Sequence, residues 1–106
     1  MLGGYHIKQG DLLPPLTAVL SSTTPNFMAG ATGVRLRFKL EDGTGSVTVV
    51  LAVIVDKTKG LVRYDWQAGD TDVVGLYVAE WILDYPNGSA TFPNEGSAYF
   101  EIVDHL

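Results

Sequence analysis

The sequence has no cysteine, few histidines and few charged residues. Without cysteine there is neither a disulfide framework nor a thiol nucleophile, although reducing and oxidising compartments both stay open. Charged residues make up 18% of the 106 residues and give a net charge of −5. Because a mildly acidic chain suits the phosphate backbone of nucleic acids poorly, we do not expect a nucleic-acid partner.

Long apolar runs are also missing. The longest unbroken run, Val49 to Val55, is far shorter than the ~20 residues that a membrane helix needs, so we expect no membrane partner. The first residues combine Lys8 with Asp11 and a proline pair, which is unlike a secretory signal. We therefore expect synthesis in the cytoplasm.

Residues suited to catalysis are sparse. The two histidines, His6 and His105, have no metal ligand at a suitable spacing, so we interpret them as solvated, with a joint site at the chain ends as the alternative. Phosphate-loop, dinucleotide and serine-hydrolase motifs are absent. Glu80 and Asp84 share one strand face, whereas a glycosidase needs its carboxylates across a cleft. We predict that the protein is not an enzyme and binds no cofactor.

Calcium binding is a weak alternative for one segment. Asp70 and Asp72 form a D-x-D pattern, and carboxylates are preferred calcium ligands. The segment lacks the ligand number and the glycine position of an EF-hand, and acids at a chain corner commonly cap backbone amides. We therefore interpret both residues as caps and predict no bound metal.

Glycine and proline divide the chain into short runs rich in valine, isoleucine, threonine and aromatic residues. This spacing is typical of an all-β sandwich or barrel, and no window shows a helical period. We predict one domain over residues 1–106 with seven or eight strands. The expected strands are Tyr5–Gln9, Leu16–Leu20, Val34–Leu40, Val47–Val55, Leu61–Trp66, Leu76–Tyr85, Ala90–Phe92 and Ser97–Val103.

The chain start and two loops are expected to respond to assembly. Residues 1–12 are an N-terminal arm or an edge strand, which pairs either within its own domain or with a neighbour's sheet. Thr23–Gly33 and Asn87–Gly96 are the loops that we expect to become ordered on assembly.

Tyr77 marks a corner before a long strand. It follows the turn-forming segment Asp70–Gly75, and immunoglobulin-like sandwiches place a tyrosine there whose hydroxyl bonds to backbone a few residues upstream. If Tyr77 faces inward, the two-residue period of a strand brings Trp81 to the same face. We therefore predict an immunoglobulin-like antiparallel β-sandwich, with Tyr77 and Trp81 in its core and no disulfide.

The segment Val47–Val55 is apolar on both faces apart from Thr48, so one apolar row stays outside the core in either phase. A large exposed apolar patch marks a partner surface. With the odd-numbered residues inward, the predicted interface consists of Val50, Ile54, Val78 and Ile82. The alternative is that residues 1–20 fold back and cover this face.

Three basic residues alternate along one predicted strand: Arg35, Arg37 and Lys39. They could bind phosphate or an acidic neighbour. The interpretation that we favour is cross-strand pairing with acids such as Glu80 or Glu101.

A series of short elements spans nearly the whole chain. The elements are Gln9-Gly10-Asp11, Leu13–Leu20, Gly30–Phe38, Gly60–Trp66, Gly69-Asp70-Thr71, Gly75–Tyr77, Gly88 and Phe92-Pro93-Asn94. In order and spacing they resemble the N-terminal immunoglobulin-like domain of phage baseplate upper proteins and the small phage structural proteins related to it.

The resemblance implies a structural role in a virion. The expected protein is made in the host bacterial cytoplasm and assembles with other virion proteins, and with copies of itself, into a symmetric ring or shell of a tail, baseplate, neck or capsid surface. The alternative function is a bacterial immunoglobulin-like adhesion or carbohydrate-binding module. Its candidate sugar-stacking residues are Trp66, Trp81, Tyr85 and Tyr99.

Overall fold

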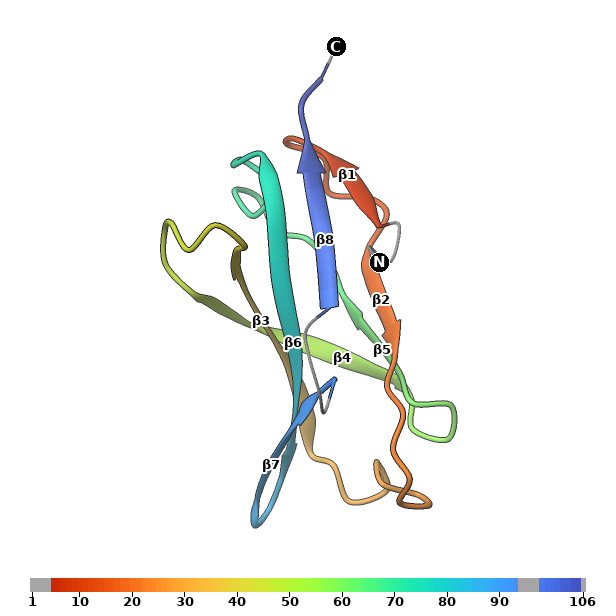
Figure 1. Cartoon of the computed structure of the whole chain (residues 1–106). Coiled ribbons are helices and arrows are strands. Elements are labelled where there is room, and N and C mark those ends of the chain that lie inside the picture. The colour runs from red at the N-terminus through yellow and green to blue at the C-terminus, as the bar shows by residue number, and fades with distance from the viewer. Residues whose placement is uncertain (1–4, 94–97, 106) are drawn as a thin grey trace.

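The computed structural model describes residues 5–93 and 98–105, and within them the chain forms eight strands and no helix (Figure 1). In the part described, no helix has the length and apolar character to cross a membrane. The strands are β1 His6–Lys8, β2 Leu16–Val19, β3 Gly33–Leu40, β4 Thr48–Asp56, β5 Leu61–Tyr64, β6 Gly75–Tyr85, β7 Gly88–Phe92 and β8 Ala98–Val103.

The strands form one curled, mixed sheet that makes a half-barrel. Its order is β1-β8-β6-β3-β4-β5-β2, with β7 paired to β6 beside this path. The predicted antiparallel arrangement is wrong for one pair, since β1 runs parallel to β8. These two strands lie at opposite ends of the chain, so no hairpin forces them to be antiparallel. Residues 6–8 thus pair within their own domain.

Strand β4 joins the two halves of the sheet. Its residues from Thr48 to Ala52 pair with β3, whereas from Val53 onward it pairs with β5. The register shifts between Ile54 and Asp56, and such a bulge bends a strand and increases its twist. Figure 1 shows β4 running across the molecule from β3 to β5, so that β5 and β2 close over the same core as β6 and β8.

Aromatic side chains fill the centre of this core. The ring of Trp66, only 3% exposed, lies 5.3 Å from those of Tyr64 and Phe100. Tyr77 stacks on Phe100 with centroids 4.9 Å apart and planes 2° from parallel. Because aromatic pairs add about 0.5–1.5 kcal/mol each beyond the burial of their surface, this cluster can hold the sheet together without a disulfide.

The corner before β6 has the geometry that the sequence predicts. Tyr77 is buried, and its hydroxyl donates a hydrogen bond to the carbonyl oxygen of Val73 at 2.7 Å. Trp81 is buried on the same face of β6, opposite Leu36 of β3.

Of the two loops that were expected to become ordered on assembly, Thr23–Gly33 forms turns that lead into β3, while Asn87–Phe92 contains the β6–β7 turn and strand β7. Residues 94–96 of the second loop, like residues 1–4 of the arm and Ser97, lie outside the described residues.

Candidate functional site

The outer face of β4 carries an exposed apolar row, which we call the outer β4 row. Such a row is ~26 Å long, because a strand rises ~3.3 Å per residue. Its central residue, Leu51, is 81% exposed, and its other members are between 44% and 53% exposed. The row consists of Val47, directly before β4, and of Val49, Leu51, Val53 and Val55 within it. Because residues 5–20 follow the edges of the sheet in β1 and β2, they do not cover it.

The side chains of β4 that face the core are the even-numbered ones, whereas the odd-numbered ones were predicted to face inward. Val50 and Ile54 were expected to face outward, but both are half-buried and pack against the core. The cause is register: Val50 pairs with Leu36 of β3, which is completely buried, so both residues share the inner face. The prediction of an exposed apolar row on this strand is confirmed, but Val50 and Ile54 are the wrong residues.

The other two predicted interface residues lie on the outer face of β6. Ile82 is only 5% exposed, so its placement at an interface is wrong. It lies opposite Arg35 and between Glu80 and Asp84, whose ion pairs flank it on the same face. Val78 is half-buried and remains a partial contributor to the outer surface.

Ion pairs flank the outer β4 row on the β3 side. Arg35 donates two hydrogen bonds to the carboxylate of Asp84, at 2.9 and 2.8 Å. Arg37 donates two to Glu80, which confirms the predicted cross-strand pairing for that acid. The bonds from Arg35 hold the pKa of Asp84 below its usual value. The predicted partner Glu101 contacts a histidine instead, with 3.1 Å between the His6 Nδ1 and Glu101 Oε1 atoms.

The charged residues on the β5 side of the row are also paired. Arg63 pairs in register with Val53, and its Nε lies 3.1 Å from a carboxylate oxygen of Asp65. The distance is that of an ion pair, but the N–H does not have hydrogen-bond geometry. The two charges attract each other all the same, because Coulombic attraction depends on distance and little on the N–H angle. Paired charges thus border the row on both sides, and the exposed Lys39 lies near Val47 on the β3 side.

A hollow of about 430 Å³ lies beside Leu51. It forms where β4 and β5 part, because their pairing starts only at Val53 and Arg63. A protruding leucine and an open hollow are therefore neighbours on one surface. The hollow is lined by Val50, Leu51, Ala52, Val53, Tyr64, Asp65 and Gln67.

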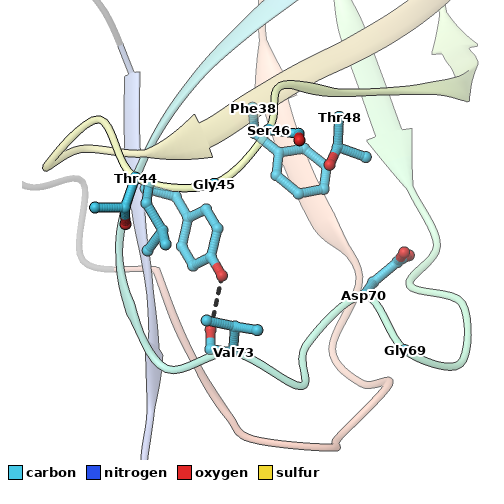
Figure 2. Close-up of a pocket in the computed structure, with 10 residues that line it drawn as sticks. Phe38, Thr44, Gly45, Ser46, Thr48, Gly69, Asp70 and Val73 are labelled. Atoms are coloured by element: carbon cyan, nitrogen blue, oxygen red, sulfur yellow. Dashed lines mark hydrogen bonds between the residues drawn. The ribbon is translucent and has the colours of Figure 1, made fainter.

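A second hollow, of about 370 Å³, lies between the β3–β4 turn and the loop before β6 (Figure 2). Two of its polar side chains, Asp70 and Tyr77, are already engaged. The Asp70 carboxylate accepts hydrogen bonds from the Tyr64 hydroxyl and, at 2.8 Å, from the Gln67 amide. The hydroxyl of Tyr77 is bonded to Val73, as the dashed line shows. Burial and the adjacent Asp70 raise the pKa of Tyr64.

The structure gives Asp70 the capping role expected from the sequence. Asp72 is exposed, and its carbonyl oxygen accepts a hydrogen bond from the Gln9 side chain at 2.7 Å. No group of three or more potential ligands gathers within residues 5–93 and 98–105. The histidines contact different partners: His6 pairs with Glu101, and His105 Nε2 lies 2.7 Å from the carbonyl oxygen of Gln9.

The four aromatic residues named for sugar stacking do not form a platform. Trp66 and Trp81 are each 3% exposed, inside the core. The hydroxyl of Tyr85 donates to the carbonyl oxygen of Phe27. Tyr99 alone is exposed, at 36%. Stacking on a sugar needs an accessible ring face, so the two tryptophans are unsuitable for this role.

Neither a protein-family model nor a curated protein sequence matches this chain.

The outer β4 row with its adjacent hollow is the candidate functional site. Leu51 was assigned to the core from the sequence, and the hollow was missed, because it depends on where β5 leaves β4. The available signal for the phase was the strict alternation of β3, whose inner residues dictate which residues of a paired strand face inward.

Proposed function

We propose that this chain is a non-enzymatic structural component of a tailed phage or prophage virion that acts by protein–protein assembly. Its place would be a tail, baseplate or neck ring, or the capsid surface. The observation that carries the assembly role is the outer β4 row: exposed apolar side chains on a hydrogen-bonded sheet. Patches of this kind mark partner surfaces. The virion assignment is supported by the series of sequence elements described above.

The proposal includes an immunoglobulin-like arrangement of the strands. In such domains strands G, F, C and C′ are neighbours in one sheet, and E and B in the other. The order β8-β6-β3-β4 fits the first group, and β5-β2 fits the second. The Tyr77 corner supports the same assignment. This chain differs in that β4 pairs with β5, which makes the two sheets continuous.

The competing functions have less support. A nucleophile needs a base within hydrogen-bond reach. In the hollow before β6, the carboxylate of Asp70 is bonded to the Tyr64 hydroxyl and the Gln67 amide, and the hydroxyl of Tyr77 is bonded to Val73. A carbohydrate-binding module would depend on exposed rings, and only Tyr99 of the four candidates is exposed.

Quantitative mass spectrometry of purified particles from the encoding strain tests this proposal. The copies of this chain are counted against the major tail and capsid proteins. A small fixed count is expected for a ring, and a count close to that of the major proteins for a decoration. Complete absence from the particles would overturn the virion role, and specific glycan binding that depends on Tyr99 would favour the alternative module.

A further inference from the structure

We infer that the outer β4 row binds a second copy of this chain, face to face, about a two-fold axis near Leu51. The inference rests on the proposed assembly function and deepens it by naming the partner and the symmetry. An isologous contact of this kind closes on itself in a pair. A ring built from the chain would therefore use a second, different contact between such pairs.

The first support is the symmetry of the row itself. Read along β4, its side chains are Val, Val, Leu, Val and Val, with the most exposed residue, Leu51, in the centre. A two-fold axis through Leu51, perpendicular to the strand and parallel to the sheet, places Val49 on Val53 of the second copy. Val47, which precedes β4, and Val55, at the bulge, lie at the ends of the row and at the margin of the contact. Two-fold interfaces need a surface that is complementary to itself, and this row meets that requirement.

The second support is the hollow beside Leu51. In a two-fold contact, a projection on one copy meets a recess on the other, and the same contact occurs twice. Leu51 is the projection, and the recess between β4 and β5 lies next to it. A small shift of the axis along β4, toward Val53, offsets the two Leu51 side chains and brings each to the edge of the hollow of the other copy. The floor there includes Ala52, a small residue that leaves space for an incoming side chain.

The third support is the charge around the row. Arg35 and Arg37 on one side are bonded to Asp84 and Glu80, and Arg63 on the other side lies against Asp65. A partner with an excess of one charge gains little from these closed pairs, because interfaces are selected by complementary potential. A second copy presents the same closed ion pairs around its row, and the exposed Lys39 near Val47 lies toward the end of the contact, away from the two-fold axis.

The size of the surface sets the expected strength. A row of ~26 Å across the width of three strands covers ~400 Å² per copy, about half of the ~800 Å² per partner in a standard interface. We therefore expect a weak dimer, with a dissociation constant of about 10 μM or above. Such a dimer is filled only at high concentration, or at the high local concentration inside an assembly.

Analytical ultracentrifugation of the purified chain over a concentration series tests the inference. A reversible monomer–dimer equilibrium is expected. Leu51→Glu should weaken it at least tenfold, because the carboxylate would be buried without a partner. Val73→Glu is the matched control, since Val73 is also exposed, at 56%, but lies in the loop before β6; it should leave the equilibrium unchanged.

Crosslinking provides a second readout that does not disturb charge. The chain has no cysteine, so Leu51→Cys introduces a single thiol that a short bis-maleimide should link across the two-fold axis. Val73→Cys should stay unlinked at the same concentration. A wild-type chain that remains monomeric at millimolar concentration, or Leu51→Glu that dimerises like the wild type, would overturn the inference.

The two proposals fail in different ways. A fixed copy number in particles together with a strictly monomeric chain would contradict the dimer and leave the virion role standing. Dimerisation through Leu51 by a chain that is absent from particles would contradict the virion role and leave the dimer standing. Binding of another virion protein to the row, blocked by Leu51→Glu while the chain alone stays monomeric, would also contradict the dimer.

Discussion

The indole N–H of Trp66 donates a hydrogen bond to the hydroxyl oxygen of Tyr5 at 2.7 Å, which joins residues 61 positions apart in the sequence. The Tyr5 hydroxyl in turn donates to the carbonyl oxygen of Pro14. Because Trp66 lies at the centre of the aromatic cluster, this relay ties the start of the described chain to the core. The edge strand β1 is thereby held as part of its own domain.

Tyr5→Phe is expected to lower the free energy of unfolding by about 1–3 kcal/mol, because the buried indole N–H loses its acceptor. Urea denaturation followed by tryptophan fluorescence measures the loss. Tyr99→Phe is the control, since the Tyr99 ring is 36% exposed, and a surface change of this kind should stay within about 0.5 kcal/mol. Equal losses in the two variants would show that the Tyr5–Trp66 bond contributes nothing.

The local pattern of the sequence was sufficient to predict that the strands exist and roughly where they lie. Val34, Leu36 and Phe38 alternate with basic residues, and the structure places these three inward. Alternation of this kind depends only on the pleat of one strand, so it can be predicted without knowledge of the neighbours. The same holds for Tyr77, whose bond spans four residues. Boundaries were less accurate: β7 begins at Gly88 and not at Ala90.

The phase of β4 could not be predicted from β4 alone. Its only polar residue before Asp56 is Thr48, and both stand in the even-numbered row. Either orientation leaves an apolar row outside the core, and the interface was predicted with the odd row, including Leu51, facing inward. The structure reverses it, because the buried residues of β3 dictate the phase of β4 through cross-strand register. The parallel β1–β8 pair and the hollow beside Leu51 likewise depend on contacts between residues distant in the sequence.

Tyr77→Phe should destabilise the domain by about 1 kcal/mol, the net value of one hydrogen bond. The loss is smaller than for Tyr5→Phe, because Val73 lies in an exposed segment where water can replace the lost donor. The phenylalanine ring would keep the stacking on Phe100. Chemical denaturation of both single variants and the double variant checks this: the two losses should add, and strong coupling would contradict the assignment of separate roles.

Gly60→Ala is expected to be far more damaging than Gly10→Ala. Both glycines have positive φ, +75° and +83°, and a side chain in this conformation costs about 1–2 kcal/mol. At Gly60 an added Cβ would also lie 2.3 Å from the backbone oxygen of Leu20, whereas at Gly10 it meets no atom within 4 Å. Thermal unfolding of the two variants should show a much larger decrease in Tm for Gly60→Ala. Similar decreases would mean that the Leu20 segment moves aside freely.

Stability should fall in strongly alkaline solution because of the buried Tyr64 and Tyr77 and the half-buried Tyr5. Burial raises the pKa of Tyr5, Tyr64 and Tyr77 above the ordinary value of 10.0, and Asp70 adds to the shift at Tyr64. A group with a raised pKa in the folded state contributes stability that is complete below its unfolded pKa. That contribution is lost as the pH rises through the folded pKa. The contribution of these tyrosines to the free energy of unfolding should therefore be constant through neutral pH and decline above about pH 10.

Asp70→Asn separates the part of this alkaline effect that belongs to Tyr64. Burial, the largest cause of the raised pKa of Tyr64, stays in this variant together with the smaller effect of Asp65, but the Asp70 carboxylate no longer contributes, so Tyr64 should lose its proton at a lower pH than in the wild type. Tyrosinate absorbance in the near ultraviolet during an alkaline titration measures this directly. Asp72→Asn is the matched control, because Asp72 is exposed and is not a cause of the Tyr64 shift. A titration curve for Asp70→Asn that overlays those of the wild type and of Asp72→Asn would contradict the electrostatic role of Asp70. Earlier tyrosine ionisation in Asp70→Asn alone would identify the Tyr64–Asp70 bond as the source of that part of the alkaline stability.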